Sequence, residues 1–353
     1  MVDLEKLRAL SSASSTEKGE DGQCIRHGGS LDGIILTHAT LPNGKQTTLL
    51  KSLLTSVCEN DCRYCPMRAG RDFRRTTFQP SEFAQLAVNL SQAGLIQGVF
   101  LSSGVAGGGV RTQDKLIETI EILRRKMGYR GYIHLKIMPG SEYDQILASM
   151  LLADRVSINL EAPTAARLPA IAPRKAFESE LMEPIRVMND IRNTLPPDRA
   201  WKGRWPSSCT QFVVGGAGET DKELLCASED LHHRHNLLRI YYSALTPHAG
   251  TPFEHHDPVP RQREQRLYQA DYLIRDYGFS ESEIGYDTDG QLPLEKDPKL
   301  IWAEKHLLHQ PVEINRASRE ELLRIPGIGP GGADAVINAR RIRTINSLSI
   351  LSR

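Results

Sequence analysis

The sequence has few of the features that mark secreted or membrane-bound proteins. It contains only six cysteines in 353 residues, and three of them lie between positions 58 and 65, which does not suggest a disulfide framework. It has no run of about 18 apolar residues that could span a membrane. Residues 1–23 also lack the apolar core of a secretion signal. These absences predict a cytoplasmic protein without a membrane partner.

Net charge is also nearly absent. Lys and Arg number 44 against 43 Asp and Glu, and the formal net charge is +1. Overall charge therefore does not indicate a polyanionic partner, and any basic surface must be local. With 40% hydrophobic and 25% charged residues, the chain has the composition of a globular protein. Its length suffices for one large domain and a small appendage.

Apolar runs of strand length alternate with helical segments along the chain. Strands are expected at 47–55, 98–105, 132–138, 155–162, 209–216 and 238–245. Helices are expected near 80–93, 112–127, 141–152, 178–193, 219–235 and 261–277. This alternation predicts βαβ units and a parallel sheet. An incomplete (β/α)6 barrel and a doubly wound sheet give nearly the same pattern, so periodicity leaves both open.

Composition divides the chain into four parts. Residues 1–45 form a polar N-terminal extension, and 46–280 carry the α/β alternation. Residues 281–310 are acidic and turn-rich, as in a linker, and 311–353 hold two short amphipathic helices around a Gly- and Pro-rich turn. The sequence therefore predicts a large α/β domain followed by a small α-helical module.

Cys58, Cys62 and Cys65 form a C-x₃-C-x₂-C run directly after the first expected strand. A structural zinc site needs four ligands, usually from two separated pairs. Only Cys24, Cys209, Cys226 or a histidine could supply the fourth, and none of them sits in a second zinc knuckle. The alternative that the three cysteines are buried and bind nothing is unsatisfactory, because they lie within eight residues and are flanked by charged residues and Asn. An iron–sulfur cluster takes thiolate ligands. With only three, a cubane would leave one iron open for an exogenous ligand.

Tyr64 precedes the last cysteine, so the run resembles the C-x₃-C-x-(aromatic)-C signature of the radical S-adenosylmethionine (SAM) superfamily. The resemblance implies a partial (β/α)6 barrel with a [4Fe–4S] cluster held by Cys58, Cys62 and Cys65. In that superfamily the open iron binds the amino and carboxylate groups of SAM. Reduction of the cluster splits SAM into methionine and a 5′-deoxyadenosyl radical, which abstracts a substrate hydrogen. An electron donor such as flavodoxin or ferredoxin is implied too.

Other elements of the superfamily match less fully. LSSGV (101–105) stands where the superfamily usually has a Gly-Gly-Glu run around the methionyl amine, but it lacks the carboxylate. NLEAP (159–163) and FVVGGAGE (212–219) stand at the ribose and adenine positions. The resemblance implies cofactor binding by Tyr64, Ser102, Ser103, Gly104, Asn159, Glu161, Val214 and Gly216. The three segments follow expected strands, at the end where barrel enzymes place their sites; ordinary strand-to-loop turns are the alternative.

Three further residues are candidates for catalysis. Cys209 begins the fifth expected strand and could donate a hydrogen atom inside the barrel, although burial as a small apolar residue is the commoner role. Cys24 and Cys226 are expected to be such buried residues. Tyr241 and Tyr242 are neighbours on the sixth strand, so one should face the interior and the other the helices. The inward tyrosine could pass a hydrogen atom, stack on substrate or simply pack.

Residues 313–341 resemble a helix–hairpin–helix module, with EINRAS, EELLRI, PGIGP and ADAVINARR in order. In that family the backbone N–H groups of the hairpin bind a nucleic-acid phosphate, which implies contacts at Gly327, Gly329, Arg340 and Arg341. A helix N-terminus carries unpaired donors and a partial positive charge, and arginines add sequence-independent attraction. Such hairpins also mediate protein contacts, and only one of the two hairpins that often form the module is present.

Taken together, these segments resemble the DNA modification/repair family of radical SAM proteins. The resemblance implies radical modification or repair of a nucleic acid, expected to be DNA, with a uracil-DNA-glycosylase-like protein as partner. The amphipathic helix at 266–279 carries Arg and Tyr that could stack bases or form a solvated face. A radical enzyme acting on tRNA or a protein stays open. So does a non-catalytic iron–sulfur DNA-binding protein, although such sites use four cysteines near the hairpin.

Overall fold

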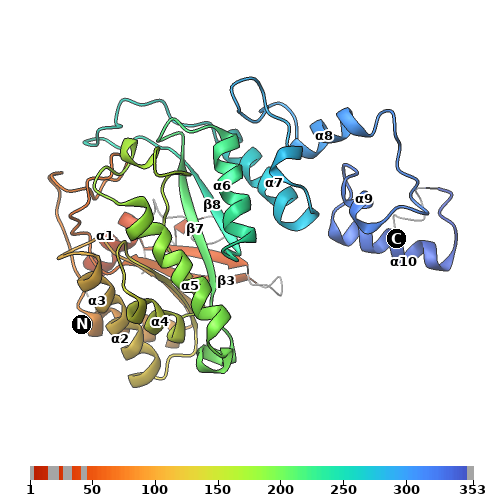
Figure 1. The fold of residues 1–353 in the computed structure, drawn as a ribbon. Coiled ribbons are helices and arrows are strands. Elements are labelled where there is room, and N and C mark those ends of the chain that lie inside the picture. Colours follow the sequence, from red (N-terminus) through yellow and green to blue (C-terminus); the bar gives the residue numbers. More distant parts are fainter. Residues whose placement is uncertain (1–3, 15–23, 27–33, 41–45, 348–353) are drawn as a thin grey trace. The chain divides into compact units, whose positions relative to one another are not determined.

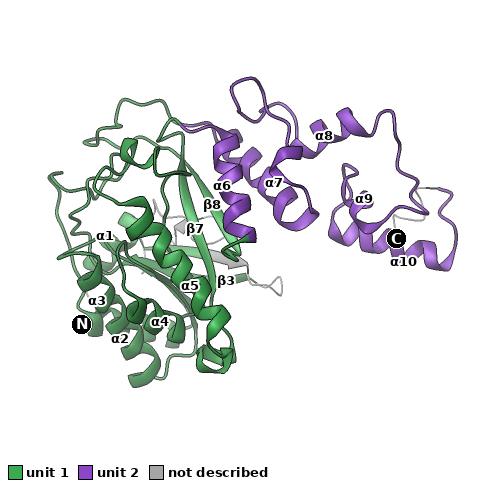
Figure 2. Ribbon diagram, in the orientation of Figure 1, with its two compact units in different colours: residues 1–218, 234–258 green, residues 219–233, 259–353 purple. Residues whose placement is uncertain are grey.

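The computed structural model describes residues 4–14, 24–26, 34–40 and 46–347 (Figure 1). The chain divides into two compact units (Figure 2). Unit 1 comprises residues 1–218 and 234–258, and unit 2 comprises residues 219–233 and 259–353. The domain boundaries expected from composition, after residues 45, 280 and 310, stay predictions.

Unit 1 is built on an eight-stranded sheet whose strands follow one another in chain order. The strands are β1 (Cys24–Arg26), β2 (Ile35–Thr40), β3 (Gln46–Leu53), β4 (Gly98–Ser102), β5 (Tyr132–Lys136), β6 (Arg155–Ser157), β7 (Ser207–Val214) and β8 (Arg239–Ala244). β1 to β3 pair antiparallel, whereas β3 to β8 pair parallel. The six parallel strands coincide with the six expected ones, which confirms the α/β prediction. The antiparallel pair β1–β2 was not expected.

The order of the parallel strands distinguishes between the two expected architectures. A doubly wound sheet reverses its strand order at a switch point, but here each parallel strand lies beside the next one in sequence. The sheet is therefore a curled half-barrel. Its strands read as almost continuous apolar runs because both faces are covered; all five residues of β4, for example, are buried.

The helices of unit 1 also fall close to their expected positions. They are α1 (Leu4–Ala13), α2 (Pro80–Gln92), α3 (Gly109–Glu121), α4 (Tyr143–Leu152) and α5 (Glu183–Thr194). Neighbours contact one another in chain order from α2 to α5. Helix α2 starts at Pro80 as its sequence predicts, because the Glu82 carboxylate accepts a hydrogen bond from the backbone N–H of Gln79. Two π-helical turns, Ile122–Lys126 and Phe177–Met182, flank α3 and α5.

Unit 2 is helical. It contains α6 (Asp221–His233), α7 (Arg261–Tyr277), α8 (Pro298–His306), α9 (Arg319–Leu323) and α10 (Pro330–Ile342). A buried hydrogen bond of 2.9 Å between His232 Nε2 and Asp271 Oδ1 joins α6 to α7, and α7 contacts α8. The stretch expected to be a linker, 281–310, thus contains helix α8.

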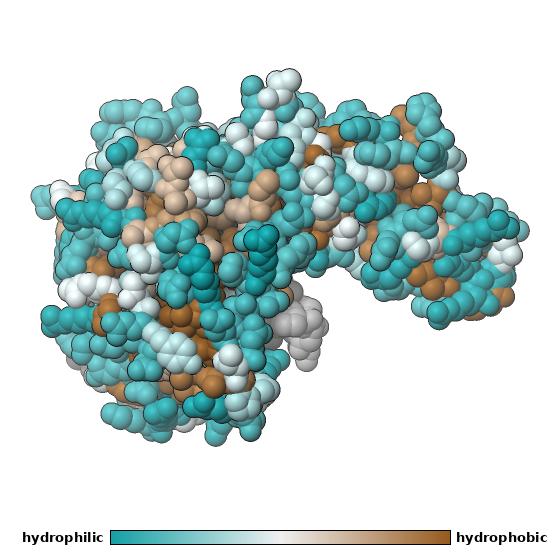
Figure 3. All heavy atoms as spheres, in the orientation of Figure 1, coloured by the Kyte–Doolittle hydropathy of each residue, from teal (hydrophilic) through white to brown (hydrophobic). Residues whose placement is uncertain are grey.

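The last two helices share a small hydrophobic core. Leu322 and Leu323 of α9 pack with Ala333 and Val336 of α10, and all four are buried. The helices are joined by the turn at 324–329. None of the described helices is long and apolar enough to cross a membrane. The face shown in Figure 3 is mostly hydrophilic over each unit, with apolar residues in separate small groups, as is ordinary for protein surfaces.

Candidate active site

The loop that follows β3 carries the three cysteines and is shaped by its own arginines. Arg75 donates hydrogen bonds to the carbonyls of Ser56 (2.7 Å), Met67 (3.0 Å) and Arg68 (2.9 Å). Arg71 donates to the carbonyl of Pro66 at 2.9 Å. Loop carbonyls that are removed from water need such donors. Two of the five arginines near the cysteines therefore hold the loop together.

The three cysteines line one cavity of about 80 Å³. It lies where β4, β5 and β6 end, the carboxyl edge of the parallel sheet. Six predicted cofactor residues also line it: Tyr64, Ser102, Ser103, Gly104, Asn159 and Glu161. The structure thus brings together residues that are about 100 positions apart in sequence, because parallel strands place their ends at one edge of the sheet.

The arrangement of the thiols suits a cluster better than a single metal ion. Within the part of the chain that the structure describes, no three thiol, imidazole or carboxylate groups could hold one metal ion. A mononuclear zinc site is therefore not supported. In an iron–sulfur cluster the thiolates bind separate irons, so three thiols that line one cavity fit it. Burial raises the pKa of Cys62 to about 12, and metal binding would favour its thiolate form.

The end of β4 is shaped to approach the cysteine loop. A Cβ at Gly104 would lie 2.2 Å from the carbonyl oxygen of Val57, so only glycine fits there. The Ser103 hydroxyl also lines the cavity; it is buried and has no hydrogen-bond partner among the described residues. A buried hydroxyl without a partner is costly, and a polar group such as the methionyl end of SAM would satisfy it.

Replacing Gly104 by Ala should impair cluster assembly. The new methyl group would push the backbone at Val57, next to the predicted ligand Cys58, and we expect reconstituted iron per chain to fall by more than half. Gly70→Ala is the matched control at the far end of the same loop, because a Cβ there meets nothing within 4 Å. It carries only the strain of a positive φ, about 1–2 kcal/mol. If the two variants bind equal amounts of iron, the close approach of Gly104 to Val57 is not needed for cluster assembly.

Glu161 is not an isolated cofactor ligand. It is 2% exposed, and its carboxylate accepts hydrogen bonds from Tyr64 Oη at 2.8 Å and Lys175 Nζ at 2.7 Å. Its backbone φ is +67°, a conformation uncommon for residues other than glycine. The carboxylate retains further acceptor capacity, so its predicted contact with the ribose stays a prediction.

Two charged residues that line the cavity were not predicted. Lys136 ends β5 and donates a hydrogen bond to Asn159 Oδ1; a lysine inside an apolar strand was a signal that could have revealed it. Lys175 lies in the long loop after β6, and nothing in its local sequence marks it. Burial lowers the pKa of Lys175, but the negative charges of the Glu161 carboxylate and of Cys62 in its thiolate form outweigh burial and raise this pKa above its ordinary value.

Five of the residues predicted to bind the cofactor or to take part in catalysis do not line the cavity. Val214 ends β7 and is fully buried. Gly216 allows the side chain of Ile171 to approach, since a Cβ there would lie 2.6 Å from Ile171 Cδ1. Cys209 is buried with its Sγ 3.8 Å from His134 Nε2. The other two, Tyr241 and Tyr242, lie on β8. The roles predicted for these residues stay predictions.

The two tyrosines of β8 face opposite sides of the sheet, as expected for neighbours on a strand. Tyr241 Oη accepts a hydrogen bond from Arg155 at 3.3 Å, whereas the Tyr242 ring packs on Phe212 with centroids 6.3 Å apart. The expectation that Cys226 is buried is wrong, because it is exposed on α6, where its position faces solvent. The side chain of Cys24 lies outside the described residues.

The predicted phosphate-binding hairpin forms the turn between α9 and α10. Gly327 has φ +83°, and the N–H groups of Gly331 and Gly332 lie in the first turn of α10, where a helix leaves donors unpaired. Lys299 of α8 donates a 2.6 Å hydrogen bond to the Ile328 carbonyl. A Cβ at Gly329 would lie 3.1 Å from Tyr277 Oη. The turn is therefore supported by α7 and α8 of the same unit.

The two arginines of α10 differ in their surroundings. Arg340 donates to the carbonyls of Ala317 at 2.6 Å and Ile314 at 3.1 Å, so it ties α10 to the segment before α9. Arg341 is exposed. Contact with phosphate stays a prediction for both, but Arg340 already has a structural role.

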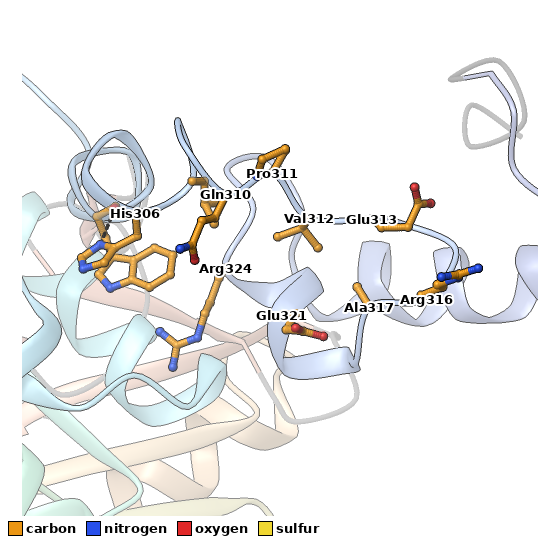
Figure 4. A pocket seen from close by; sticks show the side chains of 11 residues that line it. His306, Gln310, Pro311, Val312, Glu313, Arg316, Ala317, Glu321 and Arg324 are labelled. Atoms are coloured by element: carbon orange, nitrogen blue, oxygen red, sulfur yellow. Dashed lines mark hydrogen bonds between the residues drawn. The ribbon is translucent and has the colours of Figure 1, made fainter.

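A larger hollow of about 560 Å³ lies beside α8 and α9 of unit 2 (Figure 4). The rings of Trp302 and His306 stack there with centroids 4.4 Å apart. Arg324 lies over the Trp302 ring and pairs with Glu283. Its charge is thus already compensated, and none of the residues predicted from the sequence to have a functional role lines this hollow.

The half-barrel and its three cavity thiols define the class of protein to which the chain belongs. Residues 52–230, which are 179 of the 353 residues, match the family model of the Radical SAM superfamily. The chain belongs to this superfamily, whose enzymes use a [4Fe–4S] cluster and S-adenosylmethionine. Membership of the superfamily confirms the prediction that the protein is an enzyme that uses these two cofactors.

Solved structures share the fold. The chain is similar to methylornithine synthase (PylB), with a TM-score of 0.50 and 13% identity over 64% of this chain and 62% of that one. It is also similar to the FeFe-hydrogenase maturase HydG from Carboxydothermus hydrogenoformans, with a TM-score of 0.50 and 14% identity over 64% of this chain and 51% of that one. The chain thus spans less than two-thirds of either protein. A search of curated proteins found no match.

Proposed function

We propose that this protein reductively cleaves SAM and uses the resulting radical to modify or repair DNA. The observation that supports the cleavage step is the cavity in which Cys58, Cys62 and Cys65 lie beside the ends of β4 to β6. A bound cluster would supply the electron that breaks the carbon–sulfur bond of SAM. The protein would supply the loop that positions the thiols, the Ser103 hydroxyl and the charged groups of the cavity wall.

DNA as the substrate is supported by the C-terminal hairpin and by the resemblance of the sequence to the DNA modification/repair family. Gly331 and Gly332 are exposed at the N-terminus of a 13-residue helix, where backbone donors and the helix dipole favour an anion. Arg341 adds an exposed cation on the same helix. A uracil-DNA-glycosylase-like partner, a flavodoxin- or ferredoxin-like electron donor and a cytoplasmic location belong to the same proposal.

The direct test is an anaerobic assay of SAM cleavage by the reconstituted protein, with and without DNA oligonucleotides. We expect 5′-deoxyadenosine to form under reducing conditions, and to form several-fold faster with DNA. Nucleoside analysis of the DNA should then detect a modified base. If tRNA or a protein stimulates SAM cleavage and DNA does not, the substrate is that molecule and not DNA. Absence of cleavage in a protein with a full cluster would favour a non-catalytic cluster.

Gly331→Asp tests the hairpin separately from the reaction. The new carboxylate should stabilise the start of α10 through the helix dipole, and a Cβ at this position meets nothing within 4 Å. It would nevertheless repel a phosphate, so we expect DNA affinity to fall several-fold in electrophoretic or anisotropy assays. Cluster content and DNA-free SAM cleavage should be unchanged.

Asn338→Asp is the matched control, since it adds the same charge at an exposed position of the same helix, beyond its first turn. Its DNA affinity should fall much less. If Gly331→Asp and Asn338→Asp bind DNA equally, the hairpin does not contact phosphate and serves in protein packing.

Arg341→Ala tests the exposed cation of the same helix. It should reduce the dependence of DNA affinity on salt by about one phosphate contact, roughly 0.9 in the log–log slope.

A further inference from the structure

The wall of the cysteine cavity contains a buried cation whose position the superfamily signature does not explain. The side chain of Lys175 is 9% exposed, and its ammonium forms an ion pair of 2.7 Å with Glu161, whose side chain is 2% exposed. Tyr64, from the cysteine motif itself, donates to the other oxygen of the same carboxylate. The tyrosine, the carboxylate and the lysine thus form one chain of contacts along the cavity.

The segment that carries Lys175 is fixed against the cysteine loop at several points. The backbone N–H of Arg63 donates to the Ile171 carbonyl at 2.8 Å. Arg174 donates through Nη1 to the Glu59 carbonyl at 2.7 Å, and its backbone N–H donates to Asp61 Oδ1 at 3.2 Å. These contacts give Lys175 a defined position beside the thiols, which a flexible surface lysine would not have.

An ion pair with Glu161 alone is a poor reason for burying this lysine. Removing two charges from water is costly, and buried ion pairs are often no more stable than apolar replacements. The positive φ of Glu161 adds backbone strain. Such costs are typical of functional sites. A second partner lies within reach, because Lys175 lines the same cavity as Cys58, Cys62 and Cys65.

We propose that Lys175 is an electrostatic positioning residue for the cluster and raises its reduction potential. A cluster held by Cys58, Cys62 and Cys65 would be negatively charged, and one electron from a low-potential one-electron donor would make it more so. No bond forms and no proton moves in that step. A fixed cation in a poorly solvated wall favours the more negative state, because the interaction is only weakly screened there. This role concerns the cofactor and does not depend on which substrate the enzyme takes.

The structure assigns complementary roles to the other members of the chain. Glu161 holds the ammonium at a defined place, and Tyr64 links Glu161 to the cysteine loop. Lys136 also lines the cavity, but it donates to Asn159. The effect of Lys175 should therefore be separable from that of its neighbours by substitution.

The test is a redox titration of the reconstituted protein, followed by electron paramagnetic resonance of the reduced cluster. In Lys175→Met we expect a full complement of about four irons per chain and a midpoint potential shifted to a more negative value. At the potential where half of the wild-type cluster is reduced, the reduced fraction of this variant should be several-fold lower. Lys175→Arg keeps the charge and should titrate close to the wild type.

Arg186→Met is the control for loss of one positive charge in the same unit. Arg186 lies on α5 with its side chain 42% exposed, so water and salt should screen it and the potential should not move. The double variant Lys175→Met/Glu161→Gln addresses folding, because it leaves no charge buried alone. If Lys175→Met does not assemble a cluster, the double variant is titrated in its place, and a midpoint potential more negative than that of the wild type supports the proposal. If the variant that keeps its cluster, either Lys175→Met or the double variant, has the midpoint potential of the wild type, the proposal is overturned.

Discussion

Cys62→Ala should abolish the cluster. After anaerobic reconstitution we expect iron to fall from about four per chain to near zero, together with the visible absorption band and all 5′-deoxyadenosine production. The reason is that Cys58, Cys62 and Cys65 are the only thiols that line the cavity, so no other described residue there can replace a lost thiolate. Iron analysis and absorption spectroscopy provide the measurement.

Cys226→Ala is the matched control for this experiment. Cys226 is an exposed cysteine of unit 2, and its loss should leave iron content and SAM cleavage unchanged. Circular dichroism of the apoproteins should show that both variants are folded, since each change removes only one sulfur atom. Retention of a full cluster by Cys62→Ala would remove the basis of the proposed reaction.

Asp154→Ala should cause a large loss of stability at a site remote from the cysteines. Asp154 Oδ2 pairs with Arg124 Nη2 at 2.7 Å, and their side chains are 5% and 1% exposed. Burial lowers the pKa of Arg124, and Asp154 opposes that shift. Without the carboxylate the guanidinium stays buried with no counter-charge, so we expect the free energy of unfolding to fall by about 3–5 kcal/mol.

Urea unfolding of the apoprotein measures this loss. The Trp201 ring lies over the Arg124 guanidinium, 4.1 Å from ring centroid to Cζ, so tryptophan fluorescence should report the transition. Lys202→Ala is the control: Lys202 Nζ contacts the same carboxylate at 2.9 Å, but its side chain is 46% exposed. Its loss should cost about 0–1 kcal/mol. Similar losses in the two variants would mean that the buried pair contributes no more than the exposed one.

The sequence by itself determined the parallel strands and most helices of the half-barrel. The predicted strand at 98–105 and the helix at 261–277 correspond to β4 and α7, because the period of apolar residues is a property of contiguous sequence. The spacing of Cys58, Cys62 and Cys65 likewise placed three thiols on one loop. Ser103 and Glu161 could be placed in the same cavity because parallel strands end at a common edge.

The tertiary structure decided which partners these residues have. Lys175 reaches Glu161 only through the path of the loop after β6, and no local pattern encodes that path. Arg340 was visible as a positive charge, but the carbonyls that it binds lie on the segment before α9. Gly104 and Gly216 are required by the backbone of Val57 and the side chain of Ile171, respectively. Contacts of this kind depend on how distant segments pack, and the periodicity that predicts strands and helices carries no information about them.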